Sequence, residues 1–319
     1  MKYYVGFDTS NYTTSMAACD ENGKIIANVK IPLPVKEGQR GLRQSDAVFL
    51  HTKNLPEIFA PFEELTREYD SVLALGASSK PRDAEDSYMP CFLVGKAQAI
   101  GYASAAKAPV YFFSHQSGHI MAALYSASTE GGADMEKLLS QPFAAFHVSG
   151  GTTEILYVDP RDDEFDVKLI GETTDLNAGQ AIDRAGVMMG IKFPCGPEME
   201  RLALNNTEKI SKARISVKGL TCCLSGLENL SADVYKKTGS AEATSSYVFE
   251  YVAATLDKMT ENLRAEYADI PIIYAGGVMS NSIIKQRLSH REGVYFASPA
   301  FSADNAAGVA LLCRRRHLQ

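Results

Sequence analysis

The feature that most constrains the fold is a strand–turn–strand pattern that occurs twice. Near the N-terminus, an apolar strand over residues 3–7 meets a turn rich in Ser and Thr, and a second apolar strand covers residues 15–19. Residues 143–158 repeat this pattern about 140 residues later. Two such hairpins predict a duplicated domain in which each half is a mixed sheet flanked by helices.

The rest of the chain alternates between helical and strand patterns, as such a domain requires. No linker-like segment separates the halves, so we expect an N-terminal lobe over residues 1–125 and a C-terminal lobe over residues 126–319, packed around a central cleft. Hydrophobic periodicity predicts helices over 47–65, 92–106, 176–189, from near 280, and over 304–312, and strands over 71–75, 110–113, 272–274 and 294–296.

Composition restricts the class of protein. The chain has 319 residues, and a chain of this length folds without disulfides or a metal, so a bound metal would be functional. Its formal net charge is −6, which does not indicate a nucleic-acid-binding surface, and the short cluster 314–316 fits the cationic end of a last helix. If the substrate is an RNA, we therefore expect another subunit to supply much of the electrostatic attraction. Six cysteines without CxxC spacing, no signal peptide and no apolar run that could span a bilayer predict a cytoplasmic protein with no membrane contact.

Glycine-rich turns after strands predict a phosphate site. Ser149, Gly150 and Gly151 offer hydroxyls and closely approachable backbone N–H groups, which can cradle a phosphate. One such turn is no more than an ordinary hairpin turn, but related turns occur at 8–10 and at 275–278. Three of them in a duplicated α/β chain are typical of the nucleotide cleft of the actin-like ATPase and sugar kinase superfamily. Neither GxxxxGK[ST] nor a GxGxxG after a strand is present, which excludes P-loop and Rossmann sites.

Two histidines are spaced for a metal. His115 and His119 follow a predicted strand and open a helix, where residues at i and i+4 share one face and can bind one ion. The alternative is that one histidine caps the helix and the other packs beneath it. A zinc protease needs Glu after the first histidine, and Gln116 stands there, so zinc proteolysis is excluded.

At this point the chain resembles a known family. Residues 91–119 resemble the segment that leads into the HxxxH of the TsaD family, the catalytic subunits of tRNA threonylcarbamoyladenosine synthase, formerly described as O-sialoglycoprotein endopeptidases and peptidase M22-like. Further motifs follow in the family's order: VSGGTTE (148–154), GETTDLNAGQAIDRAG (171–186), FPCGPEME (193–200), LSGLEN (224–229), AGGVMSN (275–281) and SADNAA (302–307).

The resemblance implies a fold of duplicated ribonuclease-H-like lobes in the actin-like ATPase and sugar kinase superfamily, with cofactors bound in its cleft. A divalent metal, iron or zinc, would be held by His115, His119 and Asp304. His147 stands where some family members carry a further ligand, and a satisfied core histidine is the alternative. An adenine nucleotide, ATP or an acyl-adenylate, would contact Ser149, Gly150, Gly151, Asp183, Gly196, Glu200 and Asn281.

The resemblance also implies an activity and partners. Family members transfer a threonylcarbamoyl group from its adenylate to the exocyclic amine of a tRNA adenosine, and the metal would hold and polarise the substrate. The implied partners are the nucleotide, tRNA bound through a complex, and either other tRNA-modification subunits or a second copy of the chain.

Two departures indicate a divergent paralogue. The family's first turn reads Glu-Thr-Ser-Cys-Asp-Glu-Thr, whereas this chain keeps a carboxylate only at Asp8, the candidate catalytic residue, and has Asn11 and Tyr12 in place of the later two. Neither replacement is a general base near neutral pH. The family's Gly-Pro-Gly-Leu loop is also replaced, at residues 77–82.

Three hypotheses therefore stay open. The chain is a threonylcarbamoyl transferase with substituted catalytic groups, a paralogue that uses another carbamoyl- or acyl-adenylate or hydrolyses ATP, or a non-catalytic nucleotide-binding scaffold of a tRNA-modification complex. The retained histidine pair counts against the scaffold.

Overall fold

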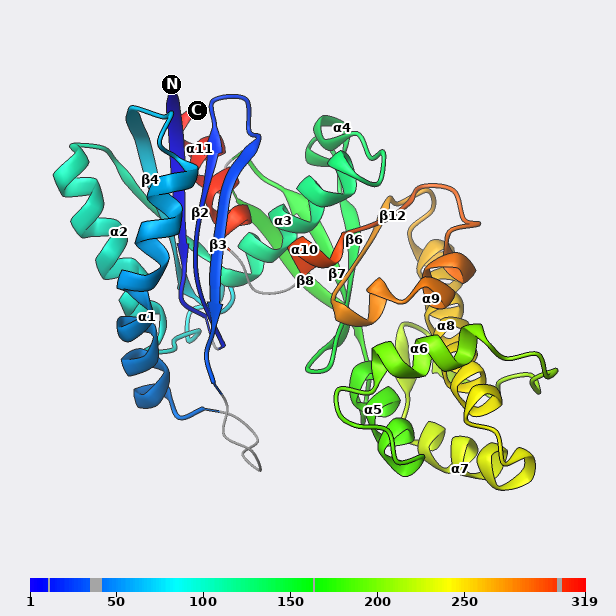
Figure 1. Ribbon diagram of the computed structural model, residues 1–319. Helices are drawn as coiled ribbons and strands as arrows, with labels where there is room; N and C mark the ends of the chain where they lie inside the picture. The colour runs from blue at the N-terminus through cyan, green and yellow to red at the C-terminus, as the bar shows by residue number, and fades with distance from the viewer. Residues whose placement is uncertain (11, 35–41, 163, 303–305) are drawn as a thin grey trace. The chain divides into compact units, whose positions relative to one another are not determined.

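The computed structural model describes residues 1–319 except 11, 35–41, 163 and 303–305 (Figure 1). The chain forms two compact units. The first unit consists of Met1–Ser126, Pro160–Asp166 and Ala300–Gln319, and the second unit of Ala127–Asp159 and Val167–Pro299.

A five-stranded mixed sheet forms the centre of the first unit, in the order β3-β2-β1-β4-β5. β1 pairs antiparallel with β2 and parallel with β4, and β4 pairs parallel with β5. The strands are β1 (Lys2–Asp8), β2 (Thr13–Asp20), β3 (Ile25–Pro32), β4 (Ser71–Lys80) and β5 (Val110–Ser114), and the helices are α1 (Gln44–Leu65), α2 (Phe92–Ala106), α3 (His115–Thr129) and α11 (Ala307–His317).

The second unit repeats this sheet, in the order β8-β7-β6-β11-β12. β6 pairs antiparallel with β7 and parallel with β11, and β11 pairs parallel with β12, so the strand order and the directions of these three pairs match those of the first unit. The strands of this sheet are β6 (Phe143–Val148), β7 (Thr153–Pro160), β8 (Phe165–Glu172), β11 (Ile272–Ala275) and β12 (Val294–Phe296). The other elements are α4 (Met135–Leu139), α5 (Ala178–Met188), α6 (Gly196–Leu204), the hairpin β9 (Ser216–Lys218) and β10 (Thr221–Cys223), α7 (Gly226–Thr238), α8 (Ala241–Glu266), η1 (Gly277–Ser280) and α9 (Ser282–Leu288). The short helix α10 (Pro299–Ser302) begins at the last residue of the second unit and continues in the first.

The duplication predicted from the two hairpins is therefore confirmed. Each predicted helix and strand also has a counterpart, although the strand predicted over 71–75 extends to residue 80 and the start of the last predicted helix lies outside the described residues. The sequence reasoning missed α4, α6, α7, α8, α10, β8 and the β9–β10 hairpin.

The C-terminal helix α11 belongs to the first unit. Its residues from Ala307 to Cys313 are all buried, as expected for a helix that is covered on several sides. It packs so closely on β1 that a Cβ at Gly6 would lie 2.5 Å from the Ala310 nitrogen. The compact units therefore divide the chain differently from the two consecutive lobes predicted above.

The arginines at the end of α11 are used within the first unit. The Arg314 and Arg315 Nε atoms donate to the carbonyls of Glu21 and Asp162, at 2.8 and 2.7 Å. The prediction that this cluster ends a helix is confirmed. No helix in the described part of the chain is long and apolar enough to cross a membrane.

Candidate functional site

The histidine pair lies where β5 passes directly into α3. The Ser114 hydroxyl accepts a hydrogen bond from the Ser117 N–H at 3.1 Å and so caps the first turn of the helix. His115 and His119 follow each other by one turn, and their ring centroids are 4.3 Å apart. The structure thus brings the two imidazoles together on one helical face, as the spacing predicted.

A buried carboxylate faces the first histidine. The Asp8 side chain, 2% exposed at the end of β1, places Oδ2 2.8 Å from Nδ1 of His115. Its Oδ1 accepts the Ser10 N–H at 3.0 Å. An ionised carboxylate only accepts hydrogen bonds, so Nδ1 of His115 is the donor in this contact. A carboxylate that holds a histidine in this way is the usual outer partner of a metal-bound imidazole.

The other two predicted metal ligands come from other parts of the chain than the histidine pair. Asp304 lies outside the described residues. His147 belongs to the second unit, on β6 opposite Glu154 of β7, with Nδ1 3.8 Å from the Glu154 Oε1. Within the described ranges, no group of three His, Cys, Asp or Glu side chains is arranged to hold a metal.

The predicted phosphate turn joins β6 to β7. The Ser149 N–H donates to the Thr152 carbonyl at 2.7 Å, and the Ser149 hydroxyl accepts the N–H groups of Gly151 and Thr152 at 3.2 and 3.1 Å. Gly150 and Gly151 are exposed, and the Gly150 N–H donates to no other described residue. This turn therefore offers a backbone donor to solvent at the end of a rigid strand.

Two glycines from other elements let the backbone close around this turn. A Cβ at Gly179, near the start of α5, would lie 2.7 Å from the Gly150 Cα. A Cβ at Gly276, which follows β11, would lie 2.3 Å from the Val148 carbonyl oxygen, and this glycine also has a φ of +103°. Only glycine fits at either position. The turn, the start of α5 and the end of β11 therefore meet at one edge of the sheet.

The other predicted nucleotide contacts lie around α5, α6 and α9. The Asp183 Oδ1 accepts the Cys195 N–H at 2.8 Å, next to Gly196 at the start of α6. The Glu200 Oε1 accepts the Ser282 N–H at 2.6 Å, and Asn281 caps α9 by accepting the N–H groups of residues 283 and 284. The structure brings these residues together in the second unit, and all three side chains hold helix ends.

Asp175 is a polar anchor that the sequence reasoning missed. It accepts the Leu176, Leu224 and Ser225 N–H groups and the Ser225 hydroxyl, at 2.5 to 3.2 Å. Burial raises the pKa of this carboxyl, but the four hydrogen bonds outweigh burial and lower the pKa to about 2. In the sequence, its position two residues before the Asn that caps α5 could have identified it.

The chain matches a family model and several known proteins. The model, TsaD, described as tRNA N6-adenosine threonylcarbamoyltransferase, matches residues 88–311. A relative from Streptococcus agalactiae serotype V with the same description is 28% identical over 329 residues, covering 97% of this chain and 91% of the relative. A Streptococcus pneumoniae relative of that description is also 28% identical, over 90% of this chain and 83% of its own length.

Solved structures share the fold at low identity. Component A of the (R)-2-hydroxyglutaryl-CoA dehydratase of Acidaminococcus fermentans has a TM-score of 0.55 at 13% identity and full coverage of both chains. Full-length HypF, in a phosphate- and nucleotide-bound form, has a TM-score of 0.59 at 12% identity, covering 98% of this chain and 55% of HypF. A ROK family glucokinase from Streptomyces griseus has a TM-score of 0.50 at 14% identity, covering 98% and 99%.

These structures have the actin-like ATPase and sugar kinase fold, and the two matching mixed sheets of this chain have it as well. Because the family model covers well over half of the sequence, the chain belongs to the TsaD family, the family of tRNA N6-adenosine threonylcarbamoyltransferase.

Proposed function

We propose that this chain binds an adenine nucleotide and a divalent metal and transfers a threonylcarbamoyl group from its adenylate to an adenosine of tRNA. The observation that carries the proposal is the match of residues 88–311 to the TsaD family. The reaction forms a C–N bond between the adenosine N6 and the carbamoyl carbon. The bond from that carbon to the phosphate oxygen breaks, AMP leaves with the electron pair, and the amine loses a proton.

The turn after β6 is the proposed phosphate site. Gly150 presents an N–H that no other described residue accepts, and the first turn of α5 lies against it at Gly179. Helix N-termini and glycine turns of this kind favour anions. Asp183, Gly196, Glu200 and Asn281 are proposed to shape the site for the nucleoside, since they fix the ends of α6 and α9 beside α5.

His115, His119 and Asp304 are the proposed metal ligands, with His147 as a further ligand. The described donors fit a metal such as iron or zinc, because two imidazoles share one face and a buried carboxylate orients the first. When bound, the ion would supply Lewis-acid polarisation and a fixed point for a substrate oxygen.

Asp8 was predicted from the sequence as the catalytic residue, and its contacts support a different role. Both of its oxygens are within hydrogen-bonding distance of partners, and one partner is the His115 ring. We therefore propose that Asp8 positions His115 and fixes its protonated nitrogen. A role as general base would require this carboxylate to leave the imidazole.

Partners and location follow from the same proposal. An acidic chain that modifies tRNA is expected to act in the cytoplasm and together with other tRNA-modification subunits or with a second copy of itself. A paralogue that uses another carbamoyl- or acyl-adenylate is the second candidate. The observation that favours it is the first turn, where Tyr12, 43% exposed, stands in place of an acidic residue.

Metal content tests the ligands. Protein purified without chelator is expected to carry about one iron or zinc per chain, and His115→Ala, His119→Ala and Asp304→Ala are each expected to lose it. Asp8→Asn is expected to weaken metal binding by about 10-fold or more, measured by chelator competition, because the outer partner is lost. His290→Ala, which removes an exposed histidine, is the matched control. Metal content equal to wild type in the His115 and His119 variants would refute the assignment.

The reaction is tested with threonylcarbamoyl-adenylate and an unmodified tRNA transcript, with and without partner subunits. Mass spectrometry of the digested nucleosides should detect N6-threonylcarbamoyladenosine. Failure to form it, under conditions in which a Streptococcus agalactiae relative succeeds, would exclude the transferase and leave the paralogue or the scaffold. AMP release without tRNA modification would favour the paralogue.

A further inference from the structure

The segment between α6 and β10 exposes a row of basic side chains. Ala213, Ile215 and Val217 are half-buried and pack against the core of the second unit, whereas the residues between them are exposed. Lys212, Arg214, Ser216 and Lys218 therefore lie on one side of the segment. Ser216 and Lys218 lie on β9, where side chains two residues apart are about 7 Å apart, and the same alternation of exposed and half-buried residues continues back to Lys212.

The backbone that carries this row is held in place. Ile215 and Val217, which alternate with the exposed side chains, pack against the core of the second unit. Next to Lys218, the Asn262 side chain of α8 donates to the Gly219 carbonyl at 2.7 Å. The backbone positions from which these cationic side chains extend are thus fixed. A ligand that binds several of them does not have to order the backbone.

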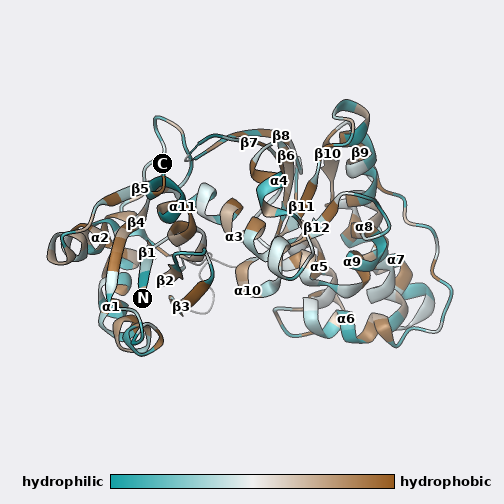
Figure 2. Ribbon diagram, turned by 90° about the horizontal axis from the view of Figure 1, so that it is seen from above, coloured by the Kyte–Doolittle hydropathy of each residue, from teal (hydrophilic) through white to brown (hydrophobic). Residues whose placement is uncertain are grey.

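Helix α7 adds one more cation to the same surface. Lys237 is exposed in its last turn. A cavity of about 630 Å³ is lined by Lys212 and Arg214 of the segment and by Lys237 of α7, with Leu230 and Val234 among its apolar lining residues. Figure 2 shows the mainly hydrophilic segment that leads from α6 to β9, with α7 next to it. We call the surface formed by Lys212, Arg214, Lys218 and Lys237 the basic face.

The charge of the basic face is not neutralised within the described part of the chain. None of its four cations forms an ion pair with a described residue, and among the described residues Asp233 is the one acidic residue that lines the cavity. Between residues 209 and 218 the sequence has four basic and no acidic residues, although the whole chain has a net charge of −6. Arg314 and Arg315 of α11, in contrast, are bound to carbonyls of the first unit.

We propose that the basic face binds the phosphate backbone of the tRNA substrate. This inference rests on the proposed function, and it assigns to the chain itself part of the attraction that the net charge suggested another subunit would supply. A row of regularly spaced cations with a Ser hydroxyl between two of them matches a polymer of evenly spaced phosphates, which Lys, Arg and Ser contact without reading sequence. An acidic protein would need no such regular spacing.

The test is binding of the full chain to an unmodified tRNA transcript at several salt concentrations. Lys212→Ala/Arg214→Ala is expected to bind tRNA about 10-fold more weakly, and the slope of log K against log salt should fall by about 1 for each cation removed. The matched control is Lys53→Ala/Arg67→Ala, which removes one exposed Lys and one exposed Arg from the first unit. It should leave affinity and slope within about twofold of wild type, and circular dichroism should show both variants folded.

Equal losses of tRNA affinity in the two double variants would overturn the proposal. An unchanged salt slope in the Lys212/Arg214 variant would also overturn it. The proposal would also be overturned if the Lys212/Arg214 variant bound tRNA with wild-type affinity but bound polyglutamate more weakly. That result would assign the surface to an acidic protein. The outcome is separable from that of the proposed function. If tRNA binding depends on the basic face but no transfer occurs, the transferase fails and the RNA surface stands.

Discussion

At the end of β1, the Asp8 carboxylate is nearly fully buried and bonded to an imidazole that comes from α3, 107 residues later in the chain. The residue type alone suggested a catalytic acid or base. The tertiary contact changes that interpretation, because a carboxylate that holds Nδ1 of His115 determines which nitrogen of the ring can bind a ligand. No local pattern around Asp8 contains this information. The spacing of His115 and His119, in contrast, follows from helix geometry and was predictable.

Asp175 provides a test by pH. Its pKa is lowered from 3.8 to about 2, so its ionised form stabilises the folded state above pH 4, and this contribution is lost as the pH falls from about 4 toward 2. The carboxyl is largely exposed, so solvent screening limits the contribution to below about 1 kcal/mol. Asp175→Asn should therefore lower the free energy of unfolding at pH 6 and make it less dependent on pH between 4 and 2.

Acid titrations followed by circular dichroism would measure both quantities. Asp269→Asn, at an exposed position outside this network, is the control and should follow wild type. A variant whose stability keeps the full wild-type change between pH 4 and 2 would show that the hydrogen bonds of Asp175 do not stabilise the fold.

Among the elements, the hairpins could be predicted and the long helix α8 could not. The hairpins alternate apolar strands with turn residues, which is a local signal. α8 is 26 residues long and buried around most of its circumference, and its buried residues include Thr244, Ser245, Thr255 and Thr260. The hydroxyls of Thr255 and Thr260 donate to carbonyls four residues earlier, at 2.8 and 2.7 Å. Polar residues satisfied inside their own helix weaken the apolar periodicity by which a helix is recognised.

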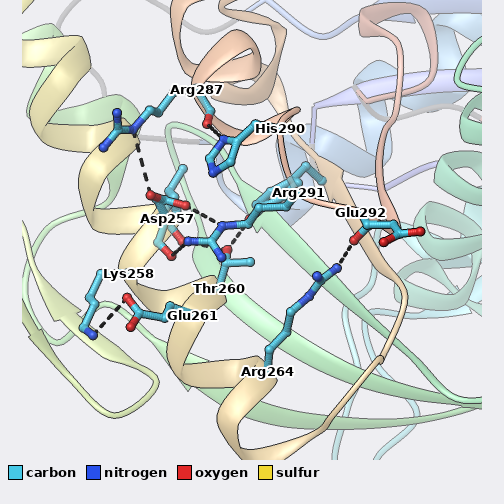
Figure 3. A network of polar contacts seen from close by, with 11 residues as sticks. Asp257, Lys258, Thr260, Glu261, Arg264, Arg287, His290, Arg291 and Glu292 are labelled. Carbon is cyan, nitrogen blue, oxygen red and sulfur yellow. Dashed lines mark hydrogen bonds and ion pairs between the residues drawn. The ribbon is translucent and has the colours of Figure 1, made fainter.

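α8 also anchors the segment between α9 and β12. Asp257 lies 2.6 Å from the Arg291 Nε and 3.9 Å from the Arg287 Nε, and the side chains of Asp257 and Arg291 are only 17% and 22% exposed (Figure 3). Asp257→Ala should destabilise the protein by about 2–3 kcal/mol, because it leaves two arginines without their partly buried carboxylate. Glu261→Ala, on the same helix, breaks an exposed pair with Lys258 and should cost less than about 1 kcal/mol. Urea unfolding of the two variants compares them directly, and equal losses would contradict this account.

For the whole molecule, the presence of two similar sheets could be predicted from the duplication, whereas the packing of the chain's two ends could not. The repeated hairpins predicted two similar sheets, and the sheets have the same strand order. α11, however, is separated from β1 by about 300 residues and packs on it through glycines and alanines. Small residues carry little apolar signal, and periodicity within α11 does not indicate which sheet it will cover. Contacts between distant segments therefore define the first unit.

The fit of α11 leads to a prediction for the whole first unit. A Cβ at Gly308 would lie 1.8 Å from the Gly118 carbonyl oxygen of α3, so Gly308→Ala must push α11 away from α3 and should cost about 2 kcal/mol or more. Gly101→Ala makes the same chemical change in α2, where no atom lies within 4 Å of the new Cβ, and should raise stability by about 0.5–1 kcal/mol. Hydrogen exchange of the β1 amides would report the first unit in both variants. If these amides exchange at the same rate in Gly308→Ala as in the wild type, then α11 does not hold the N-terminal strand in the sheet. In that case, the contact between the two ends of the chain is not what stabilises the first unit.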